Sequence, residues 1–76
     1  MKQFGKVVAF NGFNGFIKGI DGKDYLIINH EIMDEIKLND NVYFEPDNYK
    51  STEIDQDIAR FIRPIKKGYE KEGPTK

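Results

Sequence analysis

The chain has 76 residues and a mass of 8.8 kDa, which is room for a single domain. It contains no cysteine, which excludes disulfide bonds, thiolate metal sites and cysteine nucleophiles. No apolar run is long enough to span a bilayer and no signal segment opens the chain, so we expect a soluble cytoplasmic protein without a membrane partner. The formal net charge of −1 lacks the overall basic character typical of nucleic-acid-binding domains.

The charges are unevenly distributed along the chain. Residues 1–30 carry four lysines and two aspartates, a net charge of +2. Residues 31–57 carry nine acidic residues and two lysines, a net of −7, and residues 58–76 carry six basic and two acidic residues, a net of +4. If folding brings the two ends together, they would form a basic face despite the negative total. Ordinary solvated surface charge is the alternative interpretation.

The first half of the chain predicts three β-strands. Residues 5–10 are rich in β-formers and end at an Asn-Gly break. A second strand over residues 13–20 ends at an Asp-Gly pair, the strongest hairpin signal in the sequence. Residues 25–28 are apolar on both sides of the pleat, which predicts a third strand covered on both of its faces.

The middle of the chain predicts one short helical turn. Residues 30–37 space their apolar side chains as a helix would, and Asn29 is placed to cap it. Residues 38–41, Leu-Asn-Asp-Asn, then predict a turn. The connection between the third and fourth strands is therefore expected to contain a brief helical segment.

Two further strands are predicted in the second half. Residues 42–45 form the fourth strand, which we expect to stop at Pro46. Residues 47–56 are polar and predict a loop, and residues 57–62 form a fifth strand that is closed by Pro64. Each proline is interpreted as the end of a strand because it cannot donate a ladder hydrogen bond.

Five short strands favour an all-β barrel, because an open sheet of this size would leave apolar edges unpaired. We therefore predict a five-stranded antiparallel OB-type barrel with one short helical turn over residues 1–65. An SH3-like barrel is the nearest competitor from the pattern alone. Residues 66–76 are charged and poor in apolar side chains, which predicts a flexible, disordered C-terminal tail.

A series of short landmarks follows in a characteristic order. They are Gly5-Lys6-Val7, Phe10-Asn11, Gly15-Phe16-Ile17, Asp21-Gly22, Asp24, Val42-Tyr43-Phe44-Glu45 and Ala59. In this order they resemble the cold-shock domain, over residues 3–63. The resemblance implies an OB barrel that binds single-stranded DNA or RNA, with exposed aromatic rings stacked on bases and a basic rim on the phosphates.

The resemblance also implies a nucleic-acid-binding site of six residues. Base stacking would come from Phe10, Phe13 and Phe16, and phosphate contacts from Lys6, Lys18 and Arg60. Two Phe three positions apart cannot both face outward on a regular strand, so either a bulge restores the pair or Phe13 lies in the preceding turn. A core position for Phe10 and Phe16 is the competing interpretation.

Three aliphatic residues depart from the family pattern. Val8, Leu26 and Ile28 stand where cold-shock domains keep basic, aromatic or histidine side chains. Aliphatic groups offer no π surface and no cation–π partner to a base. Such a patch suits a protein surface at least as well, so a protein-interaction module, including a homodimer, is the alternative function.

No catalytic constellation is visible in the sequence. His30, the lone histidine, has no nucleophile or acid partner at a recognisable spacing. Gly-rich phosphate loops and calcium-loop spacing of carboxylates are both missing. We therefore expect a protein that is not an enzyme and that uses neither a cofactor nor a metal ion.

Overall fold

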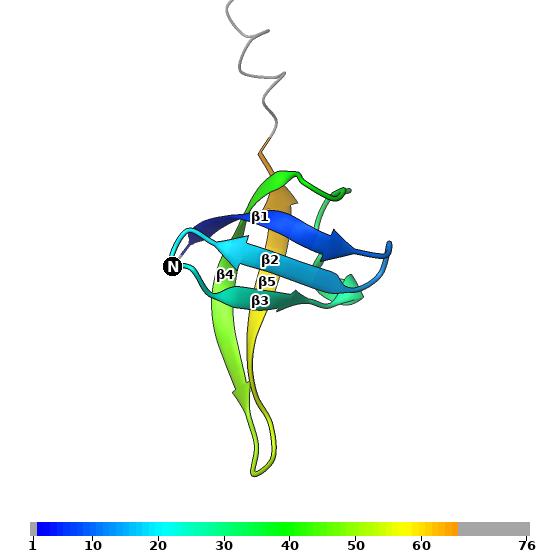
Figure 1. Ribbon diagram of the computed structural model, residues 1–76. Coiled ribbons are helices and arrows are strands. Elements are labelled where there is room, and N and C mark those ends of the chain that lie inside the picture. The colour runs from blue at the N-terminus through cyan, green and yellow to red at the C-terminus, as the bar shows by residue number, and fades with distance from the viewer. Residues whose placement is uncertain (1, 66–76) are drawn as a thin grey trace, which may run out of the picture.

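The computed structural model describes residues 2–65, which form a closed five-stranded β-barrel (Figure 1). The strands are β1 (Gln3–Phe10), β2 (Gly15–Gly19), β3 (Asp24–Ile27), β4 (Asn41–Lys50) and β5 (Asp55–Pro64), with a 3₁₀ turn η1 (Asn29–Glu31) between β3 and β4. The predicted all-β class and five-stranded barrel are confirmed. The predicted tail, residues 66–76, lies outside the described residues.

The strands close in the order β1-β2-β3-β5-β4. Four neighbouring pairs are antiparallel, and β3 and β5 run parallel. The predicted antiparallel orientation therefore holds for four of the five pairs and not for β3 and β5. Strand direction cannot alternate all the way round a closed ring with an odd number of strands, so five strands require a parallel pair.

Residues from all five strands fill the barrel interior, in alternation on β2, β3 and the first part of β4, whereas on β5 the neighbours Ile58 and Ala59 are both buried. The buried apolar side chains that form one cluster are Val7, Ile17, Tyr25, Ile27, Ile36, Val42, Phe44, Ala59 and Ile62. Val7, Ile17 and Tyr25 are register partners across β1, β2 and β3, so their neighbours in sequence point outward. On β3 the alternate residues Tyr25 and Ile27 are buried and Leu26 is partly exposed, so the prediction of a strand covered on both faces holds in part.

The predicted stop at Pro46 and the predicted loop over residues 47–56 were both wrong. β4 continues to Lys50 and pairs with β5 through Pro46 opposite Ala59, which makes a long hairpin that projects beyond the barrel (Figure 1). Pairing of β4 with β1 ends at Phe44. From there β4 is an edge strand on that side, so a residue without an N–H group costs no ladder hydrogen bond.

The predicted short helical turn is present as η1, but it does not extend over residues 30–37. η1 ends at Glu31, and the next residue, Ile32, is extended and forms a parallel bridge with Ile62 of β5. Asn29 is the first residue of the turn rather than its cap, and Ile28 occupies the cap position without a side-chain hydrogen bond. Pairing with β5 outweighs helical spacing because the bridge satisfies backbone groups that a second helical turn would otherwise use.

A hydrogen bond between two side chains stabilises the β2–β3 hairpin. The Tyr25 hydroxyl donates to Asp21 Oδ2 over 2.6 Å, and the Lys23 amide donates to Asp21 Oδ1 over 3.0 Å. Burial, followed by the bond to Asp21, raises the pKa of Tyr25 to about 12. The hydrogen bond from Tyr25 lowers the pKa of Asp21 below its ordinary value.

We expect the free energy of unfolding to fall as the pH rises from 10 to 12. The Tyr25 phenol keeps its proton to about pH 12 in the folded chain but ionises near its ordinary pKa of 10.0 when unfolded. Over this interval the unfolded state binds fewer protons, so stability falls with a slope of at most about 1.4 kcal/mol per pH unit for this group.

Urea unfolding of the native chain, Tyr25→Phe and Tyr49→Phe across that interval measures the effect. Tyr25→Phe should flatten the slope because it has no phenol to ionise. The exposed hairpin residue Tyr49 is the matched control, and its variant should keep the native slope. Equal slopes for native protein and Tyr25→Phe would contradict the assignment.

Candidate nucleic-acid interface

The outer surface of β1, β2 and β3 forms one continuous face, which is toward the viewer in Figure 1. The residues that define this β1–β3 face are Lys6, Val8, Ala9, Phe16, Lys18 and Leu26. All are exposed except Leu26, which is partly buried. They share a face because their sequence neighbours on each strand fill the barrel interior.

Phe16 lies at the middle of the β1–β3 face. Its side chain is 38% exposed, and its register partners are Ala9 on β1 and Leu26 on β3. The small Ala9 side chain leaves the Phe16 ring open on that side. Phe16 is therefore a surface aromatic, and the competing core interpretation does not hold for it.

Phe13 lies in the turn between β1 and β2, which decides between the two predicted arrangements. The Asn11 side-chain oxygen accepts hydrogen bonds from the Phe13 and Asn14 amides, both over 2.9 Å. Gly12 between them has a φ of +99°, a left-handed conformation that favours glycine. The Phe13 side chain is 64% exposed at the tip of this turn.

A bulge is present, but in β1 rather than in β2. The register shifts between Val7 and Ala9, so that Val8 is the extra residue and its side chain is 46% exposed. After the bulge Ala9 opposes Phe16 and Phe10 opposes Gly15. Phe10 is only partly exposed and packs against the core cluster, so it contributes less surface than Phe16.

Lys6 and Lys18 face each other across β1 and β2. Like charges at directly opposed positions repel, so an anion between them would be favoured. Lys18 Nζ also lies 3.1 Å from Asp24 Oδ1, but both side chains are about half exposed, so solvent screens this pair. A largely apolar groove of about 450 Å³ adjoins the two lysines, between Phe4 and Ile20.

Arg60 does not lie with these lysines. On β5, its guanidinium donates to Asp47 Oδ2 over 2.6 Å and to Glu31 Oε2 over 2.7 Å. The hydrogen bond from Arg60 lowers the pKa of Asp47, and the bond to Asp47 raises the pKa of Arg60. A phosphate would have to compete with two carboxylates for this side chain.

The aliphatic residues of the alternative function are brought close to Phe16. Leu26 is its direct neighbour on β3, and Val8 is the exposed bulge residue of β1. Ile28 follows β3 at the entry to η1 and is partly buried. The β1–β3 face is therefore mixed, with two lysines and one aromatic ring beside aliphatic side chains.

Most of the acidic segment lies away from the β1–β3 face. Five of the nine acidic residues between 31 and 57 belong to the β4–β5 hairpin or its turn: Glu45, Asp47, Glu53, Asp55 and Asp57. The outer part of that hairpin extends past the edge of β3 (Figure 1). Just over half of the acidic residues in the middle of the chain are thus on β4, β5 or their turn rather than on the β1–β3 face.

Four apolar residues around the barrel are exposed or partly exposed but were not predicted as surface residues from the sequence: Phe4, Ile20, Tyr43 and Phe61. Phe4 alternates with Lys6 on β1, so the period-two pattern would have placed it on the outer surface had the strand been started at Gln3. Phe61 had no comparable signal, because a register shift between β4 and β5 decides its direction.

Within residues 2–65, His, Asp and Glu side chains form no group of three or more that could hold a metal ion. The same part of the chain contains no helix with the length and apolar character needed to cross a membrane. Comparison with models of known protein families gives no match, and comparison with curated proteins gives none either.

Proposed function

We propose that the protein is a cytoplasmic single-strand-binding protein that contacts DNA or RNA through the β1–β3 face. The observation that carries the proposal is an exposed Phe16 ring on the same face as the opposed Lys6 and Lys18. Stacking on an aromatic ring accepts any base, and lysines contact the phosphates that link successive bases. The resemblance to the cold-shock domain supports the same function.

Phe13 and Phe16 act together in this proposal. Phe13 lies in the turn that leads into β2, and only Asn14 separates it from that strand, which carries Phe16. Both rings are exposed, so each offers a surface on which one base can stack. Phe10 packs partly against the core, so only the remaining part of its ring is open to a base. Arg60 does not contact phosphate in this proposal, because it donates hydrogen bonds to two carboxylates.

We expect the affinity for a short oligo(dT) or oligo(U) strand to fall as salt rises. If Lys6 and Lys18 each neutralise about one phosphate, the logarithm of the binding constant should fall with a slope of roughly −1.4 against log salt. Fluorescence anisotropy of a labelled strand in a salt series measures this slope, and Lys6→Gln should reduce its magnitude by about 0.7.

Lys50→Gln is the matched control. Lys50 is an exposed lysine near the hairpin tip, 3.7 Å from Asp55, and its loss should leave the slope unchanged. No detectable binding at low salt would remove the proposed function. An equal effect of Lys6→Gln and Lys50→Gln would locate the binding elsewhere than on the β1–β3 face.

A protein-interaction function, with a homodimer as its simplest form, is the second candidate. It is favoured by the exposed Val8 side chain on the same face as Phe16 and Leu26. Val8→Lys separates the two functions, because it should tighten oligo(dT) binding but abolish self-association. Sedimentation that shows a monomer for the native chain at every concentration would count against the homodimer.

A further inference from the structure

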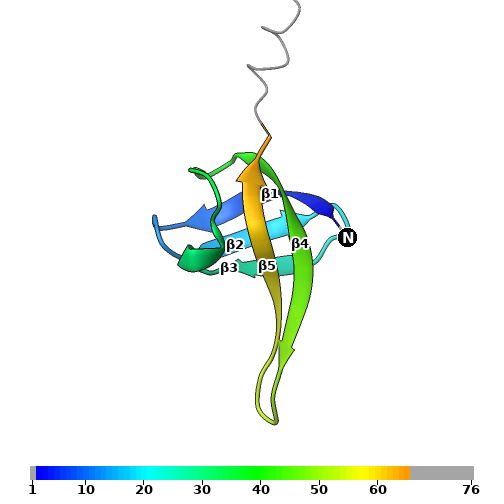
Figure 2. The same ribbon diagram turned by 180° about the vertical axis from the view of Figure 1, so that it is seen from behind.

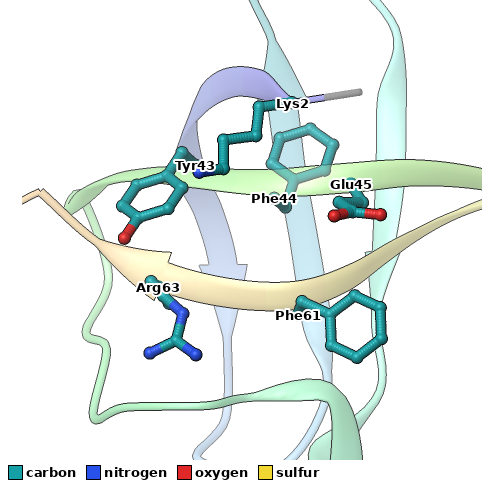
Figure 3. A pocket seen from close by; sticks show the side chains of 6 residues that line it. All are labelled: Lys2, Tyr43, Phe44, Glu45, Phe61 and Arg63. Carbon is teal, nitrogen blue, oxygen red and sulfur yellow. The ribbon is translucent and has the colours of Figure 1, made fainter.

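A second group of aromatic and charged side chains lies on the outer surface of β4 and β5, which faces the viewer in Figure 2. It surrounds a groove of about 360 Å³, which is within the size range of small-molecule sites. The residues that line this β4–β5 groove are Lys2, Tyr43, Phe44, Glu45, Phe61 and Arg63 (Figure 3). Apart from Phe44, which is buried, they are exposed or partly exposed.

Phe61 has an unusual backbone conformation. Its φ is +53°, in the left-handed region that bulky side chains rarely adopt, and its side chain is 49% exposed. The register between β4 and β5 shifts here, since Tyr43 opposes Arg63 whereas Glu45 opposes Arg60. The shift keeps Ile62 in the core while Phe61 points outward.

Hydrogen bonds to the Glu31 carboxylate stabilise this conformation. The Phe61 amide donates to Glu31 Oε1 over 3.2 Å, and Arg60 donates to Glu31 Oε2 over 2.7 Å. The Glu31 side chain is buried. Strained positions persist only where the surrounding contacts determine them, and such positions cluster at ligand sites.

The groove has a cationic end and an anionic end. Tyr43 and Arg63 lie at one end, and Lys2 Nζ sits 5.0 Å from the Tyr43 ring centroid (Figure 3). Glu45 and Phe61 lie at the other end. An aromatic ring is thus placed beside a carboxylate, with two basic groups farther along the groove.

We propose that the β4–β5 groove binds a nucleotide whose base carries an exocyclic amino group. Phe61 stacks on the base, Glu45 accepts a hydrogen bond from the amino group, and Lys2 and Arg63 contact the phosphate. Cytosine fits this pattern, because a carboxylate accepts from its N4 amino group, whereas uracil presents a carbonyl oxygen that a carboxylate repels. This site is separate from the β1–β3 face and does not rest on the function proposed for it.

Titration of the full chain with cytidine monophosphate, uridine monophosphate and inorganic phosphate tests the proposal by backbone amide shifts. Cytidine monophosphate should shift the amides of Tyr43, Glu45, Phe61 and Arg63. It should bind about tenfold or more tightly than uridine monophosphate. Phosphate alone should bind more weakly than either. Equal affinities for the two nucleotides, or shifts confined to the β1–β3 face, would overturn it.

Two variants sharpen the test. Phe61→Asn removes the ring but keeps a residue that tolerates positive φ, and it should weaken cytidine monophosphate binding about tenfold. Glu45→Gln should abolish the preference for cytosine over uracil, because an amide can accept from one base and donate to the other. A native preference for cytidine over uridine monophosphate in Glu45→Gln would overturn the proposal. So would native affinity for cytidine monophosphate in a folded Phe61→Asn. Either result is sufficient, so the test remains decisive if one variant fails to fold.

Tyr49→Asn on the exposed hairpin is the matched control and should bind as the native chain does. Phe16→Ala should also keep the groove intact, which separates failure of this site from failure of the β1–β3 face. An oligo(dC) strand identifies the source of the nucleotide. If Phe61→Asn weakens oligo(dC) as well as the monophosphate, the groove takes a base of a strand. If only the monophosphate is affected, it takes a free nucleotide.

Discussion

Phe16→Ala is expected to weaken the binding of a short oligo(dT) strand by about 5- to 150-fold, which corresponds to the loss of one base stack. The ring is the exposed aromatic at the centre of the β1–β3 face, between Ala9 and Leu26. Neither neighbour has a π surface that could replace it. Fluorescence anisotropy at one fixed low salt concentration measures the change.

Tyr49→Ala is the control for this experiment, because Tyr49 is also an exposed aromatic on a strand but lies on the projecting hairpin. Its affinity for the strand should match that of the native chain. Phe16→Ala should lower the free energy of unfolding by much less than the roughly 3–5 kcal/mol typical of a fully buried Phe. Urea unfolding of this variant measures the loss. A folded Phe16→Ala variant with native affinity would refute the assignment of Phe16.

Gly15→Ala is expected to lower the free energy of unfolding by about 3 kcal/mol or more, at or above the upper end of ordinary overpacking costs. A Cβ at Gly15 would lie 1.9 Å from the Ala9 carbonyl oxygen, and this neighbour is backbone that cannot rotate away. Relief of the clash requires β1 and β2 to separate where Phe10 opposes Gly15. The same movement displaces Phe16, so binding of a single strand should weaken too.

Gly12→Ala is the matched control, since it adds the same methyl group to the same β1–β2 hairpin, in its turn rather than in β2. Gly12 has open space around it, and its only requirement is a φ of +99°. Its substitution should cost about 1–2 kcal/mol for the left-handed conformation alone. Urea unfolding of both variants compares the two costs, and a smaller loss for Gly15→Ala would mean that the close approach of β1 and β2 is not as described.

Local patterns were sufficient to predict five strands and, within two residues, where each of them begins. The Asp-Gly pair at residues 21 and 22, predicted as a hairpin signal, forms the β2–β3 turn. These features depend on neighbours in sequence, because side chains alternate along any strand and positive φ favours glycine. The outward direction of Lys6 and Lys18 follows from the same alternation.

Long-range pairing decided the features that prediction missed. Pro46 is tolerated inside β4 because β1 has already left that edge, which no local signal reveals. The predicted phosphate contact Arg60 is held by Glu31, a residue 29 positions earlier in the chain. The residues of the β4–β5 groove come from β4, from β5 and from Lys2 ahead of β1, and they meet only when the barrel closes.

The amino-acid sequence alone therefore determines an all-β chain with five strands, an alternating interior and basic residues beside Phe16. The requirement for a parallel pair was also implicit, because a closed ring of five strands cannot alternate throughout. Only the tertiary structure decided that Val8 bulges outward, that Phe61 takes a left-handed conformation, and that the acidic segment extends as a hairpin. A bulge or a shifted register depends on which strands lie on either side, and that information is absent from any short stretch of sequence.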